Sequence, residues 1–130
     1  MSMQHNAVNW FEIPATDLDR AKAFYLAAFG YELADAEMGP AKFSMFAADH
    51  GLPGAGGCLM QSKGYAPSHA GTMVYFPVPD IEATLGKIGE AGGKTLVPKT
   101  PIGEHGHIAH FEDTEGNRVG LHTPPGGLQG

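Results

Sequence analysis

Two stretches of the chain, residues 7 to 15 and residues 72 to 78, place strongly apolar residues at every second position. Successive side chains of a strand point to opposite faces, so each stretch predicts a strand with one buried face. The residues on these apolar faces are Phe11, Ile13 and Ala15 in the first stretch and Val74, Phe76 and Val78 in the second. We expect both apolar faces to lie against helices.

A helical pattern follows each of these strands. Apolar residues recur every three or four positions from Thr16 or Asp17, either of which can cap a helix, to Gly30. The same spacing runs from Asp80 to the glycine pair that begins at Gly92. Capping side chains begin helices and glycine commonly ends them. The repeating apolar positions are Leu18, Ala21, Tyr25 and Ala28, then Ile81, Leu85 and Ile88.

Shorter strand patterns complete each half of the chain. They cover residues 31 to 34, 43 to 47 and 57 to 61 in the first half, then 94 to 97, 107 to 111 and 118 to 123 in the second. A glycine-rich loop, DHGLPGAGG, precedes the third of these, and PKTPIGEHG is expected to be a loop. The turn DTEGN has the aspartate, glycine and asparagine that tight turns require, so it predicts a hairpin.

The two halves of the sequence match without a gap when one is shifted by 63 residues. Asp17 then falls on Asp80, Gly30 on Gly93 and Gly57 on Gly120. The pattern predicts one α+β domain of two βαβββ modules in tandem. Module 1 covers about residues 7–62, module 2 about residues 71–123, and residues 124–130 form a flexible tail. We expect one curved mixed sheet with the helices on its convex face and a cleft on its concave face.

Composition narrows the possible partners. A net charge of −6 argues against nucleic acid, whose phosphates require basic residues. No apolar run reaches the roughly twenty residues that span a bilayer, so no membrane segment is predicted. The beginning of the chain has neither the basic nor the apolar part of a signal peptide, which favours a cytoplasmic protein. A single cysteine, Cys58, excludes a disulfide within the chain and is expected to be a buried, inert thiol.

The segment WFEIPATDLDRAKAFYLAAFG, its repeat and the hairpin FEDTEGNRVGL resemble the vicinal oxygen chelate superfamily. That superfamily includes glyoxalase I, extradiol dioxygenases, fosfomycin-resistance enzymes and bleomycin-resistance proteins. The resemblance covers about residues 7 to 123 and is greatest to small glyoxalase-related proteins of undefined activity. One fold here hosts several chemistries and pure binding, so the resemblance implies the fold more sharply than the activity. It also implies a homodimer, because members commonly complete their clefts across a subunit contact.

The resemblance also bears on metal binding. Metal-dependent members take ligands from the cleft face of the first and last strands of each module. Carried over, those positions fall on Trp10, Gly57, Met73 and Gly120. None of these is a usual ligand for a hard metal, so no cofactor is predicted. His105 and His107 leave an alternative open, because an HxH pair on one strand face could hold a divalent metal in a lyase or dioxygenase.

Strand alternation predicts which side chains face the cleft. They are Trp10, Glu12, Met73, Tyr75, Arg118, Gly120 and His122. Trp10 and Met73 suit an organic ligand, while Gly57 and Gly120 would leave room for it. His107 is placed as a polar cleft or edge residue. A small organic molecule is the expected partner.

Three functions stay open at this point. If the protein is an enzyme, a lyase or isomerase, Glu12 would act as the proton-transfer base, Arg118 would stabilise an oxyanion and His122 would be a second acid or base. A non-catalytic dimer that sequesters its ligand needs only the apolar floor of the cleft. The third is the metal enzyme that uses the two histidines. A structural alternative for Glu12 is an ion pair with Arg118 or a lysine.

Overall fold

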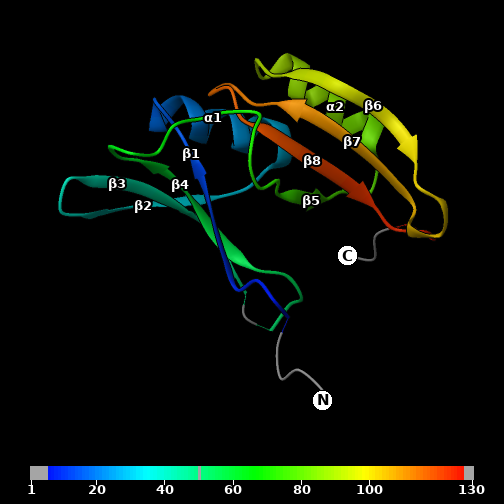
Figure 1. Ribbon diagram of the computed structural model, residues 1–130, viewed down its shortest axis with the longest axis horizontal. Coiled ribbons are helices and arrows are strands. Elements are labelled where there is room, and N and C mark those ends of the chain that lie inside the picture. Colours follow the sequence, from blue (N-terminus) through cyan, green and yellow to red (C-terminus); the bar gives the residue numbers. More distant parts are fainter. Residues whose placement is uncertain (1–5, 50, 128–130) are drawn as a thin grey trace.

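A computed structural model describes residues 6–49 and 51–127 of the chain. Its elements follow the order βαβββ twice, with a 3-10 turn in the second module (Figure 1). Module 1 contains β1 (Trp10–Pro14), α1 (Leu18–Phe29), β2 (Leu33–Met38), β3 (Ala41–Phe46) and β4 (Gly56–Gln61). Module 2 contains β5 (Tyr75–Pro77), α2 (Ile81–Glu90), β6 (Lys94–Pro101), η1 (Gly103–His105), β7 (His107–Glu112) and β8 (Arg118–Thr123).

The strands confirm the tandem α+β fold and divide between two four-stranded sheets. The order is β1-β4-β3-β2 in module 1 and β5-β8-β7-β6 in module 2. In each sheet the first strand runs parallel to the last, and the other neighbours are antiparallel. The two helices contact each other and lie behind the strands in the view of Figure 1. The strands therefore form two separate hydrogen-bonded sheets in place of the single curved sheet expected.

Both helices begin and end where the sequence predicts. Asp17 caps α1 by accepting a hydrogen bond from the backbone N–H of Arg20 at 3.1 Å, and Asp80 caps α2 in the same way. These caps satisfy backbone donors that have no partner within a helix. Gly30 ends α1 in the left-handed conformation, with a φ of 77°, which glycine adopts without a steric penalty.

One hydrophobic core serves both modules. The Phe24 ring of α1 lies 6.0 Å from Phe111 of β7, and Phe11 of β1 lies 6.0 Å from Phe76 of β5. Tyr25 is fully buried among these rings. A module of about sixty residues buries too little apolar surface to be more than marginally stable alone. The shared aromatic core therefore explains why the repeat occurs as a pair.

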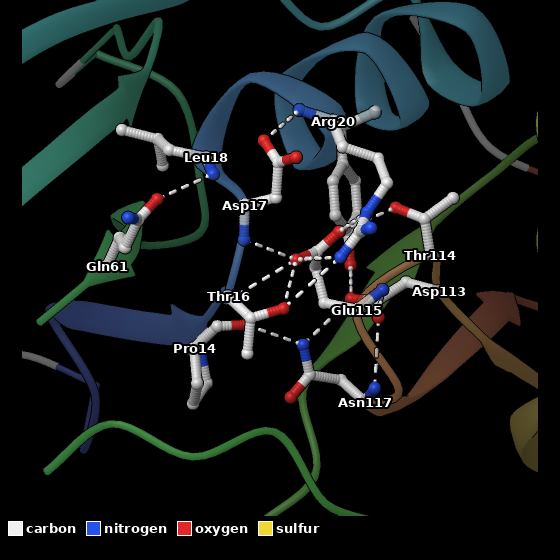
Figure 2. Close-up of polar contacts among 11 residues, drawn as sticks. Pro14, Thr16, Asp17, Leu18, Arg20, Gln61, Asp113, Thr114, Glu115 and Asn117 are labelled. Carbon is white, nitrogen blue, oxygen red and sulfur yellow. Dashed lines mark hydrogen bonds and ion pairs between the residues drawn. The ribbon is translucent and has the colours of Figure 1, made fainter. Parts of the chain in front are cut away.

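A polar network also joins the modules, and it starts from the turn between β7 and β8 (Figure 2). Glu115 in that turn accepts hydrogen bonds from the backbone N–H groups of Thr16 and Asp17 at 2.9 and 2.8 Å. It also forms an ion pair with Arg20 at 2.7 Å. A carboxylate of module 2 therefore caps the first helix of module 1, where the helix dipole favours negative charge.

Asp113 is the buried centre of the same network. Its side chain, 3% exposed, accepts hydrogen bonds from the Tyr25 hydroxyl at 2.8 Å and the Asn117 amide at 2.9 Å. The backbone N–H groups of Glu115 and Asn117 donate to its other oxygen. Asn117 also donates to the carbonyl of Pro14 at 2.7 Å. The turn predicted for its backbone geometry thus also docks module 2 onto module 1.

Some expected boundaries differ from the structure. The sequence predicts a loop at residues 98 to 101, but these residues extend β6 to Pro101. β6 is an edge strand with two register shifts, where proline costs no ladder hydrogen bond. β5 is shorter than expected, at three residues. In the tail, Gly127 donates to Pro124 in a turn, and residues 128–130 lie outside the described residues.

The helices of the described residues are too short or too polar to cross a bilayer.

Candidate functional site

The strand register corrects the way in which the two halves match. Glu12 pairs with Cys58 in module 1, and Tyr75 pairs with Gly120 in module 2. The first strands therefore match at an offset of 63 residues, but the last strands match at an offset of 62. Cys58, and not Gly57, is the structural counterpart of Gly120. The alignment of the two glycines is a coincidence of sequence, because a one-residue slip moves every side chain to the other face.

The two glycines consequently lie on opposite faces of their sheets. Gly57 is on the face toward the hydrophobic core, and Gly120 is on the other face, which we call the cleft face. A Cβ on Gly57 would overlap the ring of Phe11, which packs on the core side. A Cβ on Gly120 would overlap the ring of Tyr75, which is 44% exposed on the cleft side. Cys58 is buried, as expected, and it shares the cleft face with Glu12, its partner in the strand pairing. Burial and the charge of Glu12 raise the pKa of its thiol to about 11, so the thiol stays protonated.

Three side chains form a hydrogen-bonded chain on the cleft face of module 2. The Tyr75 hydroxyl lies 2.8 Å from Nε2 of His110. The guanidinium of Arg118 lies 2.7 Å from the other ring nitrogen, Nδ1, through Nη2 and 3.2 Å through Nε. β7 and β8 bring these residues together, because His110 is opposite Gly120 in the hairpin and Gly120 is opposite Tyr75.

The chemistry of arginine determines where the protons lie in the hydrogen-bonded chain of Tyr75, His110 and Arg118. A guanidinium only donates hydrogen bonds, so Nδ1 of His110 must accept one. Burial and the positive charge of Arg118 lower the pKa of His110, which keeps the ring neutral at neutral pH. The ring proton therefore sits on Nε2 and is donated to the Tyr75 oxygen. The Tyr75 hydroxyl can therefore donate its proton to an acceptor other than His110.

This hydroxyl borders an open groove of about 590 Å³ on module 2. Its lining residues are Tyr75, Pro77, Ile102, Ile108, His110 and His122. His122 Nε2 donates to the backbone carbonyl of His105 at 2.8 Å, which fastens the η1 turn beside the groove. Apolar walls with a few directed polar groups are the usual composition of small-molecule sites.

The cleft face of module 1 carries a different group. Glu12 accepts hydrogen bonds from the Tyr65 hydroxyl at 2.8 Å and from the Trp10 indole N–H at 3.4 Å. The ion pair considered for Glu12 and Arg118 is not present, because Arg118 bonds to His110 instead. Met73 is half-buried in the connection before β5. Glu12, Arg118 and His122 therefore do not form one hydrogen-bonded group.

The two histidines of the HxH pattern are separated by the fold. His105 is exposed in η1, with its ring 3.8 Å from Glu104. His107 is half-buried and pairs with Thr123, on the face of β7 opposite to His110. Throughout residues 6–49 and 51–127, no group of three or more His, Cys, Asp or Glu side chains could hold a metal ion. The donors present therefore do not fit the metal centre that the superfamily implies.

Sequence reasoning missed two residues of these clusters. His110 shares a face with Gly120 and Arg118, and the short DTEGN turn could have given this register. Tyr65 lies in the connection between the modules, where no periodicity predicts the direction of a side chain.

The comparisons with known proteins agree with the fold. The family model for the Glyoxalase/Bleomycin resistance protein/Dioxygenase superfamily matches residues 7–121, and the chain belongs to this superfamily. A glyoxylase-like domain-containing protein from Didymella fabae is 33% identical, over 94% of this chain and 97% of the relative. The chain spans 44% of the length of the mycobacterial and maize relatives that it also matches.

Two solved structures extend the likeness. A glyoxylase/bleomycin resistance protein/dioxygenase domain from Frankia sp. EAN1pec has a TM-score of 0.73 at 14% identity, over 93% of this chain and 99% of that one. TnmS3, an antibiotic binding protein from Streptomyces sp. CB03234, has a TM-score of 0.64 at 23% identity, over 95% of this chain and 99% of that one. At these identities the likeness shows the fold alone.

Proposed function

We propose that the protein binds a small, flat organic molecule with a hydrogen-bond acceptor in the groove of module 2. The observation that carries the proposal is the groove itself together with the chain from Arg118 through His110 to Tyr75. Ile102 and Ile108 offer apolar walls, and the Tyr75 ring offers a face for stacking. The free hydroxyl proton of Tyr75 would donate to a carbonyl, phenolate or carboxylate oxygen of the ligand.

The same geometry favours binding over proton transfer. Both ring nitrogens of His110 are engaged, one with Arg118 and one with Tyr75. A general base needs a free lone pair within reach of the proton that it removes. We therefore infer that His110 positions the tyrosine, and that the protein resembles in function the ligand-sequestering members of its superfamily.

We also retain the homodimer as a proposal. Met38, 73% exposed, and Met45, 36% exposed, lie on the cleft face of module 1, where a second subunit could cover them. Sedimentation velocity would test it directly: a single species with the mass of one chain at micromolar concentration would contradict it.

The groove can be tested with benzoate and acetophenone, two flat probes that carry an acceptor. Two-dimensional NMR of labelled protein should show saturable shifts confined to the groove residues. Tyr75→Phe keeps the ring but removes the donor, and should weaken binding by about three- to tenfold, the worth of one hydrogen bond. Tyr31→Phe, a matched change in the core, should leave the affinity unchanged. Shifts that map elsewhere, or equal affinity in Tyr75→Phe, would contradict the proposal.

A further inference from the structure

A second cluster lies on module 1 and shares no residue with the groove. Glu12 is in the middle of β1, on the face opposite to Ile13, which is buried in the core. A carboxylate on a sheet is commonly balanced by a lysine or arginine. In the part of the chain that the structure describes, Glu12 forms no ion pair. Its charge is instead held by neutral donors.

Two aromatic side chains supply those donors and converge on the carboxylate. Tyr65 donates its hydroxyl to Oε1 at 2.8 Å, and Trp10 donates its indole N–H to Oε2 at 3.4 Å. Each oxygen of an ionised carboxylate can accept about two hydrogen bonds, so each keeps capacity for another partner. The two rings also keep open surface, because Trp10 is 45% exposed and Tyr65 is 38% exposed.

The indole is held in place by the strand beside it. Gly56 of β4 pairs with Trp10, and a Cβ at Gly56 would lie 3.6 Å from the six-membered ring of the indole. The indole therefore lies close to the backbone of β4 at Gly56, while Trp10 keeps much of its surface exposed. The hydrogen bond to Glu12, at 3.4 Å, is long and adds a weak restraint on its orientation. Such a site loses little conformational freedom when a ligand binds.

The electrostatics of the cluster select the sign of that ligand. Aromatic faces carry negative potential and attract cations, most strongly for tryptophan. Glu12 adds a full negative charge between the two rings. Met45, which pairs with Cys58 on the same face, adds a polarisable apolar contact suited to methyl groups. An anion would be repelled here, and a neutral molecule could gain at most a hydrogen bond from the carboxylate and nothing from its charge.

We propose that Trp10, Glu12 and Tyr65 form a recognition site for an organic cation, specifically an alkylated ammonium group. The ammonium would lie against the carboxylate while its alkyl groups contact the indole and phenol faces. This site is separate from the groove of module 2, so the two proposals succeed or fail independently.

Trp10 is the only tryptophan of the chain, so its fluorescence reports on this site directly. Titration with tetramethylammonium chloride, at constant ionic strength held by sodium chloride, should give a saturable change in emission. Glu12→Gln keeps one acceptor oxygen but removes the charge, and should weaken binding at least fivefold. Glu37→Gln, a matched change on the other face of the same sheet, and Tyr75→Phe, in the groove of module 2, should both leave it unchanged.

Two outcomes would overturn the site. One is equal binding by Glu12→Gln, and the other is an equal response to tert-butyl alcohol, a neutral molecule of similar shape, which would indicate an apolar patch alone. Because Glu12→Gln also changes the surroundings of the indole, saturation-transfer NMR on the methyl protons of tetramethylammonium provides a second readout. Loss of that signal in Glu12→Gln but not in Glu37→Gln is the expected result.

Discussion

The two modules repeat the same order of helix and strands, with the first strand paired to the last in each, but carry opposite chemistry on their cleft faces. In module 1 a carboxylate, Glu12, is held by two aromatic donors. At the matching position of module 2 stands Tyr75, which belongs to a chain that ends in a cation, Arg118. The core-facing positions changed far less, since Ile13 and Phe76 are both buried. Packing therefore preserves one face of each first strand, while the other face is free to diverge.

The modules also differ in how they contribute to the junction between them. The turn of module 2 supplies Asp113, Glu115 and Asn117, which bind α1 and β1 of module 1. The corresponding connection in module 1, residues 47 to 55, is longer and has a different sequence. Module 2 thus anchors module 1 through these polar contacts, and the matching connection of module 1 does not repeat the residues that make them. Substitutions in the turn should test this asymmetry most strongly.

Asp113→Ala should have the largest effect on stability. It would leave the fully buried Tyr25 hydroxyl without its partner and remove the acceptor of three other hydrogen bonds. Buried donors left unsatisfied cost about 1–3 kcal/mol each, so we expect a loss of about 4 kcal/mol in the free energy of unfolding. Urea denaturation followed by circular dichroism measures it.

Asp113→Asn separates charge from hydrogen bonding at the same position. It keeps one acceptor oxygen and should cost less than the alanine variant. A loss under about 1 kcal/mol in Asp113→Ala, within the range of surface substitutions, would show that the turn does not anchor module 1.

Substitutions at Gly57 and Gly120 offer a sharper test of the difference between the core face and the cleft face. Gly57→Ala forces a methyl group into the Phe11 ring in the core, and overpacking of this kind costs about 1–3 kcal/mol. Gly120→Ala meets the Tyr75 ring instead, which is half exposed and can move aside. We expect it to cost under about 1 kcal/mol but to weaken binding of benzoate in the groove. Thermal denaturation and the NMR titration together measure both effects.

Equal destabilisation by the two alanine variants would mean that the glycines do occupy equivalent positions, as the sequence alone suggests.

The two glycines show where sequence reasoning stops. Alternation predicted both first strands, apolar spacing with capping residues predicted both helices, and the turn residues predicted the hairpin, because all of these depend on local sequence. The one-residue change in offset between β1 and β4 depends on strand pairing, which a gapless repeat cannot reveal. The positions of His110, Tyr65 and the docking role of Asp113 depend on pairing or on tertiary contact in the same way.

Glu115→Gln should have an intermediate effect, and its size should depend on pH. Partial burial opposes ionisation, but the hydrogen bonds from Arg20 and from the backbone of Asp17 and Thr16 outweigh it and hold the pKa of Glu115 at about 2. A carboxyl with a lowered pKa stabilises the fold above its unfolded value, 4.5, and loses that contribution as the pH falls toward 2.

We therefore expect Glu115→Gln to cost about 1.5–3 kcal/mol at pH 7, the range for hydrogen bonds to a charged group. Between pH 4.5 and 2 the stability of the native protein should fall toward that of the variant. Denaturation midpoints across this range measure the convergence. Glu104→Gln, an exposed change in η1, is the control and should follow the native protein at every pH. Parallel curves for native and Glu115→Gln protein would indicate that the carboxylate charge contributes nothing to the junction.

The smallest effect on stability should come from His110, and it should appear at a higher pH than the effect of Glu115. Burial and Arg118 lower its pKa below the ordinary value of 6.5, so the unfolded chain binds a proton more readily than the folded one. Stability should therefore decline slightly as the pH falls from 6.5 toward the lowered value, and then level off. His110→Asn should remove this step and leave the decline near pH 4 unchanged. If the step persisted in His110→Asn, another histidine would carry it, and the neutral ring assigned to the Tyr75 chain would lose its support.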